Sequence, residues 1–230
     1  SPADVRPAMR ERVEAQIRAL GYVRHGAARA LASSRSFTIG AVIPTLESAI
    51  FASGVDAVEN YLAETGYTLL LAVTNYDLQH EYEQVQALIE RGVDGMILVG
   101  RDHDAGTLNM LERQRCPFIT TWTYTEDAAY PCVGFDNADA ARRITAHLLE
   151  LGHKRIGVIA GVTEGNDRAW ERIVGVRTAL RSRRLKLQEN CLIEKPYDVG
   201  AGRDGLRYLM SLPKSKRPTA IFCGNDVLAI

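Results

Sequence analysis

The sequence predicts an α/β protein in which two doubly wound parallel sheets follow a short helical arm. From residue 37 onward, apolar strand-like runs alternate regularly with longer amphipathic segments. The runs are continuous and rich in Ile, Val and Leu, which is typical of strands covered by helices on both faces. The alternation starts again near residue 160. We therefore expect two sheet-containing halves whose carboxyl strand ends meet at one ligand cleft.

The composition is that of an ordinary globular protein, but its charges are unevenly distributed. Of 230 residues, 46% are hydrophobic, and 28 Lys and Arg balance 28 Asp and Glu. The first 36 residues hold only three acids, Asp4, Glu11 and Glu14. The same stretch contains arginines at positions 6, 10, 12, 18, 24, 29 and 35. A basic arm on a mildly acidic body fits an anionic partner such as DNA.

The cysteines and the chain ends indicate the cellular setting. Cys116, Cys132, Cys191 and Cys223 have neither metal nor redox spacing, so we expect free thiols in a cytoplasmic protein. The first residues lack the apolar core of a signal peptide, and no apolar run approaches membrane-spanning length. The chain starts without Met and ends inside a helix-like pattern. We therefore expect a fragment at both ends.

The arm is predicted to contain one stable helix. Met9, Val13, Ile17 and Leu20 recur at helical spacing over residues 8–20. Pro7 suits the first turn of this helix, and Gly21 ends it. Residues 26–32 form a second helical pattern that is too short to be stable alone.

The body is predicted to contain eight strands in two groups. The first group is expected at 38–43, 68–73, 95–99, 117–122 and 132–135, with helices at 51–65, 78–91 and 105–114 between its first four strands. After a helix at 138–151, the second group is expected at 155–160, 191–194 and 219–223, with helices at 168–185 and 201–212. The predicted domains are an arm at 1–36, a first half at 37–160 and an incomplete second half at 161–230.

Familiar catalytic and nucleotide-binding patterns are missing from the sequence. The loop from Gly161 to Gly165 follows a strand, but it lacks the Gly-Lys-Ser/Thr of a phosphate loop and the pattern G-x-G-x-x-G. No G-x-S-x-G motif occurs, and the histidines lack metal spacing. We therefore expect that the protein is not an enzyme and that it binds neither a cofactor nor a metal ion.

Polar and aromatic side chains gather where predicted strands end. Taken singly, Asp136, Asn137 and Asn225 are good helix-capping residues. Taken together, the set fits a polyol pocket, because aromatic faces suit sugar C–H surfaces and planar polar groups suit paired hydroxyls. The candidate ligand-binding residues are Ser48, Phe51, Asn75, Trp122, Asp136, Arg168, Arg172, Tyr197, Asn225 and Asp226.

Several segments resemble, in order and spacing, the LacI family of bacterial transcription regulators. They are Ile39-Gly-Ala-Val-Ile-Pro44, Gly66-Tyr-Thr-Leu-Leu-Leu71, Val93-Asp-Gly-Met-Ile97, His147-Leu-Leu-Glu-Leu-Gly-His-Lys-Arg-Ile156, Arg172-Ile-Val-Gly175 and Pro218-Thr-Ala-Ile-Phe-Cys-Gly-Asn-Asp226. Upstream, Val5-Arg-Pro-Ala-Met-Arg-Glu-Arg-Val13 and Leu20-Gly-Tyr22 resemble the third helix of the DNA-binding headpiece. The resemblance implies a periplasmic-binding-protein-like sensor, with a helix-turn-helix before Ser1 and the rest of the second half after Ile230.

The resemblance also implies roles for particular residues. Ala28, Arg29 and Leu31 match a hinge helix that enters the DNA minor groove, where Leu31 would wedge into a base step. Arg172 matches the arginine that clamps the effector, and Tyr197, Asn225 and Asp226 match other cleft contacts. Trp122 stands where relatives often have Asp, and Ala49 where many have Pro, which leaves the identity of the effector open.

The function that the resemblance implies is that of a ligand-responsive transcription regulator, a repressor. Its partners would be operator DNA, a second copy of the chain in a homodimer, and a small effector such as a sugar, sugar acid or sugar phosphate, with no membrane. An effector would favour one orientation of the two halves, and the hinge would order on DNA in only one of them. A periplasmic-type solute-binding protein for a sugar is the first alternative. A sugar-processing α/β enzyme is the second.

Overall fold

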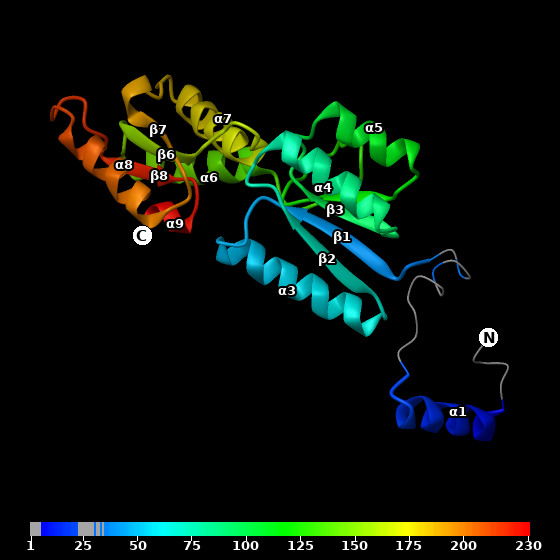
Figure 1. Ribbon diagram of the computed structural model, residues 1–230. Coiled ribbons are helices and arrows are strands. Elements are labelled where there is room, and N and C mark those ends of the chain that lie inside the picture. Colours follow the sequence, from blue (N-terminus) through cyan, green and yellow to red (C-terminus); the bar gives the residue numbers. More distant parts are fainter. Residues whose placement is uncertain (1–5, 23–29, 31–32, 34) are drawn as a thin grey trace. The chain divides into compact units, whose positions relative to one another are not determined.

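The computed structural model describes residues 6–22, 30, 33 and 35–230, and the chain divides into two compact units, 1–37 and 38–230 (Figure 1). The hinge residues Ala28, Arg29 and Leu31, and most of the predicted short helix at 26–32, lie outside the described residues. Within the described part of the chain, no helix is both long and apolar enough to cross a membrane.

The first unit contains helix α1, Pro7–Ala19, which confirms the helix predicted at 8–20 to within one residue. Pro7 stands in its first turn, and Gly21 follows with a φ of 59°. None of its residues is buried. Its apolar side chains, including Met9 and Val13, are about half exposed, at 53% and 50%.

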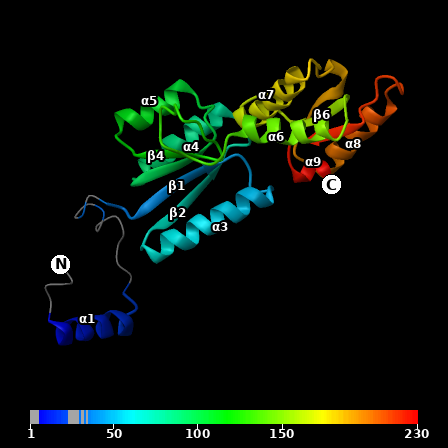
Figure 2. The same cartoon turned by 180° about the vertical axis from the view of Figure 1, so that it is seen from behind.

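The first sheet is parallel throughout and has the strand order β2-β1-β3-β4-β5. Figure 2 shows α3 on one face and α4 and α5 on the other. The strands are β1 Thr38–Ile43, β2 Thr68–Val73, β3 Gly95–Val99, β4 Phe118–Thr121 and β5 Cys132–Val133, and the helices are α3 Ala49–Glu64, α4 Leu78–Glu90 and α5 Ala105–Arg113.

The second sheet is also parallel and has the order β7-β6-β8. Helices α6 and α7 cover one face of this sheet, and α8 and α9 lie against the other. The strands are β6 Ile156–Gly161, β7 Leu192–Lys195 and β8 Ala220–Cys223. The helices are α6 Asn137–Glu150, α7 Asp167–Ser182, the 3₁₀ turn η2 Glu189–Cys191, α8 Val199–Ser211 and α9 Asp226–Ala229.

The two halves of the body are predicted to divide between residues 160 and 161, but the strand before this point pairs within the second sheet. Strand β6 is the centre of the second sheet, and Ala141 of α6 packs in the same core cluster as Ile156 and Ile173. Helix α6 follows the first sheet in sequence but covers the second, because its apolar face meets α7. The division into three domains otherwise remains a prediction.

Both sheets have the doubly wound topology that the sequence predicts, and the topology locates a crevice in each. Beside β1 lie β2 on one side and β3 on the other, and beside β6 lie β7 and β8. In open α/β sheets a ligand crevice forms outside the carboxyl ends of the strands at such a switch point. The loops after β1, β3, β6 and β8 are therefore the expected binding loops.

A few element ends differ from the sequence prediction for local reasons. Helix α7 ends at Ser182 rather than 185, because Arg184 has a left-handed φ of 58° that ends the helix. Strand β5 is only two residues long, Cys132–Val133, rather than 132–135. All four cysteines are free thiols.

Candidate functional site

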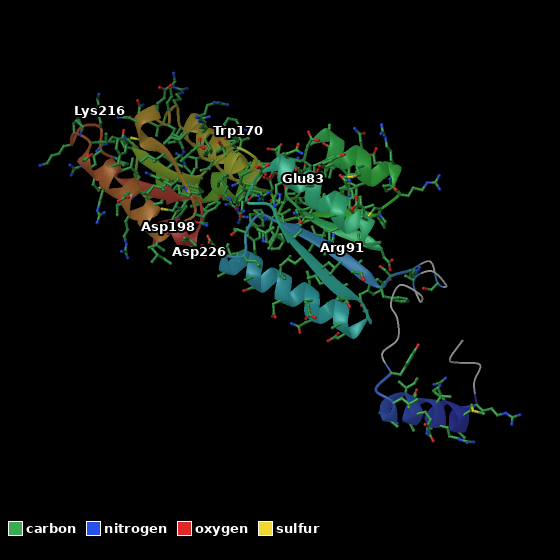
Figure 3. The ribbon with its side chains drawn as sticks, in the orientation of Figure 1. Glu83, Arg91, Trp170, Asp198, Lys216 and Asp226 are labelled. Atoms are coloured by element: carbon green, nitrogen blue, oxygen red, sulfur yellow. The ribbon has the colours of Figure 1, made fainter. Side chains whose placement is uncertain are left out.

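A pocket of about 340 Å³ lies where the loops of the two sheets meet. Its lining residues follow β1, β2, β4, β5, β6, β7 and β8. The loops after β1, β6 and β8 contribute as the switch-point topology predicts, whereas the turn after β3 does not line this pocket. Asp226, labelled in Figure 3, lies by the N-terminal end of α3. The lining is Ser48, Ile50, Phe51, Tyr76, Trp122, Phe135, Asn166, Arg168, Arg172, Tyr197, Gly224, Asn225 and Asp226.

Phe51 and Trp122 form one apolar wall of this pocket. Their ring centroids are 5.1 Å apart with an interplanar angle of 66°, an edge-to-face pair. Phe51 packs with Ile43 and Val99 at the end of the first sheet. Gly54 makes room for the pair, since a Cβ there would lie 2.6 Å from Cζ2 of Trp122. The sequence of α3 thus fixes an aromatic face in the pocket.

Arg172 lies in the second turn of α7 and is held by two neutral acceptors. Its Nε donates to Oδ1 of Asn137 at 3.1 Å, and its Nη1 donates to the Gly224 carbonyl at 2.8 Å. Among the described residues no carboxylate forms an ion pair with it. Burial lowers the pKa of Arg172 from its ordinary value. A partly buried guanidinium without a counter-ion favours an anionic or hydroxyl-rich ligand.

The Arg-x-x-Gly spacing has a structural cause. A Cβ on Gly175 would overlap the Ala138 carbonyl oxygen of α6 and would lie 2.9 Å from the Arg142 nitrogen. Gly175 thereby lets α6 lie close against α7. Close packing brings the fully buried Asn137 to Arg172, while Nδ2 of Asn137 donates to the Trp122 carbonyl at 3.0 Å. Asn137 thus connects the aromatic wall to the arginine.

Tyr76 and Tyr197 also line the pocket, with ring centroids 6.2 Å apart. Asn166 donates to the Tyr197 hydroxyl at 3.3 Å, and Gly161 leaves space for the Tyr197 ring. Burial and the neighbouring Tyr197 raise the pKa of Tyr76 to about 12, despite the charges of Arg168 and Arg172. The Tyr76 phenol therefore stays neutral at physiological pH.

A second hollow of about 400 Å³ adjoins the first and shares Ser48, Tyr76, Asn166 and Tyr197 with it. Asn75 lines this outer hollow and not the inner pocket. Glu47, Glu164 and Asp198 also line it, which makes it more acidic than the pocket around Arg172.

The structure brings together eight of the ten candidate residues in the inner pocket and separates two. The eight are Ser48, Phe51, Trp122, Arg168, Arg172, Tyr197, Asn225 and Asp226. Asn75 lies in the outer hollow, and Asp136 lies in neither, because its carboxylate accepts from Asp139 N at 2.8 Å and caps α6. Asn225 also caps a helix, through Leu228 N at 3.0 Å, which leaves its Nδ2 for a ligand.

Five lining residues are not among the ten candidates, namely Ile50, Tyr76, Phe135, Asn166 and Gly224. Asn166 carried a signal that could have been used, since it is the N-cap of α7 and stands two residues before the candidate Arg168. Tyr76 directly follows Asn75 at the end of β2. Within the described residues, no three His, Cys, Asp or Glu side chains gather as a metal site.

The fold and the pocket define a two-part ligand-binding domain of the periplasmic-binding type. Residues 36–230 match the family described as periplasmic binding proteins and sugar binding domain of LacI family. This match covers most of the chain, so the chain belongs to that family, as the sequence resemblance indicates.

Particular relatives are transcription regulators. The chain is 30% identical over 223 residues to the repressor PurR of Shigella sonnei, covering 96% of this chain and 64% of that relative. It is 29% identical to the regulator GntR of Chromobacterium violaceum, with a TM-score of 0.76 over 84% of this chain and 69% of that one. It is 26% identical to the regulator CelR, solved with cellobiose, with a TM-score of 0.67 over 98% and 67%. No enzyme family is indicated.

Proposed function

We propose that this chain is the sensing part of a ligand-responsive transcriptional repressor that acts in the cytoplasm as a homodimer on operator DNA. The family and the repressor relatives support this proposal. The chain spans about 64% of the length of such a relative, so the activity of the whole protein is part of the proposal. The solute-binding alternative is not favoured, because the named relatives are regulators.

The effector is proposed to be a sugar-like anion, a sugar acid or sugar phosphate. The observation that carries this proposal is Arg172, a partly buried guanidinium with no carboxylate partner among the described residues. The Phe51–Trp122 face would take the apolar side of a sugar ring, and Asn225 and Asp226 its hydroxyls. The volume of about 340 Å³ lies at the small end of ligand pockets.

The proposed mechanism couples the pocket to DNA through the orientation of the two halves. The pocket is lined from both sheets, so an effector contacts both halves at once and favours the orientation that fits it. The hinge, with Ala28, Arg29 and Leu31, would pair with that of the second copy and order on DNA in one orientation only. The effector and the operator thereby change each other's affinity by the same factor.

A thermal-shift screen with sugars, sugar acids, sugar phosphates and purines tests the effector class. A ligand at 100 times its Kd stabilises the folded state by about 2.7 kcal/mol, which gives a readable rise in Tm. We expect anionic sugars to raise Tm and the corresponding neutral sugars to raise it less. A rise with purines alone, or with no anion, would contradict the proposed class.

DNA binding by this chain itself is expected to be weak, salt-sensitive and independent of sequence, because phosphate contacts position a protein but do not specify a site. Gel-shift titrations with unrelated duplexes at low and physiological salt measure this. Tight binding of one duplex at physiological salt would contradict it. In a longer chain that carries a headpiece, Leu31→Ala should weaken operator binding and leave effector binding unchanged.

The proposed homodimer is supported by the exposed side of the first sheet. Helix α3 buries only Phe51, although Tyr61 on it is apolar and 68% exposed, and Leu71 of the edge strand β2 is 36% exposed. A second copy on this side would cover both. Light scattering of Tyr61→Glu against the unsubstituted chain tests this, and a dimer of unchanged stability would place the interface elsewhere.

A further inference from the structure

The turn after β3 is fastened to the start of α7 by hydrogen bonds and an ion pair. Asp167 accepts from the backbone N–H of Arg101 at 2.8 Å, and Arg168 donates through Nη1 to the Val99 carbonyl at 3.2 Å. The Arg101 guanidinium forms an ion pair with Glu171. We name residues 99–103 with the first two turns of α7 the clasp. It joins the first half of the cleft to the second.

Gly100 is the point at which the turn after β3 comes closest to α7. Its φ is +88°, a region that favours glycine. A Cβ there would overlap the side chains of Arg168 and Asp167. The N–H of Gly100 donates to the Thr121 carbonyl at 2.9 Å, so the residue is also tied to β4. The position of this backbone unit therefore determines how the two halves can meet.

His103 fixes the other side of Gly100. The side chain of His103 is only 1% exposed, and its Nδ1 lies 2.8 Å from Oε1 of Glu81 on α4. Its Nε2 lies 3.1 Å from the Gly100 carbonyl oxygen. Both partners are acceptors, and a neutral imidazole has only one N–H. Both contacts are satisfied at once only when His103 is a protonated imidazolium.

The charges around this ring favour the protonated form. Burial would lower the pKa of His103, but the hydrogen bond and charge of Glu81, the Gly100 carbonyl and the charge of Asp167 outweigh it and raise the pKa above the ordinary 6.5. Arg101, Asp102 and Asp104 flank the ring in its own loop, and Arg168 approaches Gly100 from α7. The raised pKa means that the stabilisation is complete below pH 6.5 and is lost as pH rises through the folded-state value.

We propose that the clasp is a proton-dependent connection between the two halves of the cleft, in which protonated His103 holds the Gly100 carbonyl and deprotonation releases it. The effector pocket would then respond to a proton as well as to its ligand. Arg168 and Tyr76 line both the pocket and the small hollow beside Glu81, so a shift of the turn reaches the pocket directly. This inference goes beyond the proposed function, and it holds whatever ligand the pocket takes.

Urea unfolding of the whole chain at a series of pH values tests whether protonation of His103 stabilises the fold. We expect the unfolding midpoint to fall as pH rises above about 6.5 and through the raised pKa that His103 has in the folded state. In the His103→Gln variant this fall of the midpoint with pH, the unfolding step, should be absent. The matched control His147→Gln, on the exposed side of α6, should keep it. Glu81→Gln keeps an acceptor but removes the charge, so its step should move to lower pH. Identical profiles in all four proteins would overturn the proposal.

Fluorescence tests whether the proton reaches the cleft. The chain has two tryptophans, so Trp170→Phe leaves Trp122 in the pocket wall as the sole reporter. We expect Trp122 emission to change over the pH range of the unfolding step, and to stay constant when His103→Gln is added. Constant emission in the presence of His103 would overturn the link to the pocket. Neither measurement uses DNA or an effector, so failure here leaves the proposed function untouched.

Discussion

Arg168 and Arg172 lie one helical turn apart on α7, yet their guanidinium groups have different surroundings. Arg168 is 5% exposed, donates to the Val99 carbonyl and pairs with Asp167 at 2.7 Å. Within the described residues, Arg172 donates to neutral acceptors alone, Asn137 and the Gly224 carbonyl. Both line the pocket, and both are candidate ligand residues from the sequence.

The difference separates an arginine that holds the protein together from one that is available to a ligand. A buried guanidinium with its carboxylate already has the partner that compensates its desolvation. A partly buried one without a carboxylate retains affinity for an anion that the protein does not supply. Proximity to a pocket therefore does not by itself assign a role, whereas the identity of the acceptors does.

The largest effect is expected from Arg168→Met. The substitution removes the nearer of the two guanidinium groups that pair with Asp167, whose side chain is 13% exposed, and leaves only Arg101 at 4.0 Å. It also removes the contact to Val99. Breaking a buried pair of this kind costs about 3 kcal/mol of unfolding free energy, measured by urea denaturation. A loss below about 1 kcal/mol would mean that Arg168 is not structural, and the contrast with Arg172 would fail.

Gly175→Ala should have the next largest effect. The added methyl group would overlap the Ala138 backbone, so α6 must move away from α7 at a cost of about 2 kcal/mol. Because Asn137 lies on α6 and binds Arg172, affinity for an anionic effector should fall as well. Val174→Ala, on the partly exposed side of α7, is the control and should leave affinity unchanged. Unchanged stability of Gly175→Ala would show that α6 and α7 can accommodate the added methyl group without moving apart.

Arg172→Lys sharpens the comparison at the ligand. The charge remains, but the planar fork and its bonds to Asn137 and Gly224 are lost. Effector affinity, measured by calorimetry with the anion found in the screen, should drop by about 10-fold, or about 1.4 kcal/mol, with little change in the Tm of the free protein. Arg177→Lys, outside the pocket, is the control. Unaltered affinity would assign Arg172 a structural role and leave Trp122, Tyr197 and Asn225 as better candidates.

Much of the fold follows from local sequence patterns, whereas the clasp does not. Continuous apolar runs fix the strands, and the restart of the alternation predicts the second sheet. The carboxyl ends of these strands then locate most of the pocket lining. Gly100, Glu81 and His103 lie far from Arg168 in sequence, and no periodic pattern records their contact. Such long-range polar contacts depend on how two sheets meet, which local patterns do not specify.

Neighbouring residues of similar type are a second limit of the sequence. Asp136 and Asn137 are both good capping residues, and only the true start of α6 decides between them. In the structure Asp136 caps the helix, and Asn137, one residue later, is buried and bound to Arg172. A shift of one residue exchanges the two roles, because it turns a side chain by about 100° around the helix axis.

Asp136→Ala has the smallest expected effect and tests this assignment. If Asp136 only caps α6, its loss should cost about 1 kcal/mol of unfolding free energy and leave effector affinity unchanged, because its carboxylate lies outside both hollows. Asp136→Asn should restore most of the stability, since an amide oxygen caps as well as a carboxylate. Urea denaturation and calorimetry on the same samples measure both quantities. A 10-fold loss of affinity in Asp136→Ala with unchanged stability would instead place Asp136 at the ligand, together with Arg172, in a conformation of the cleft that differs from this one.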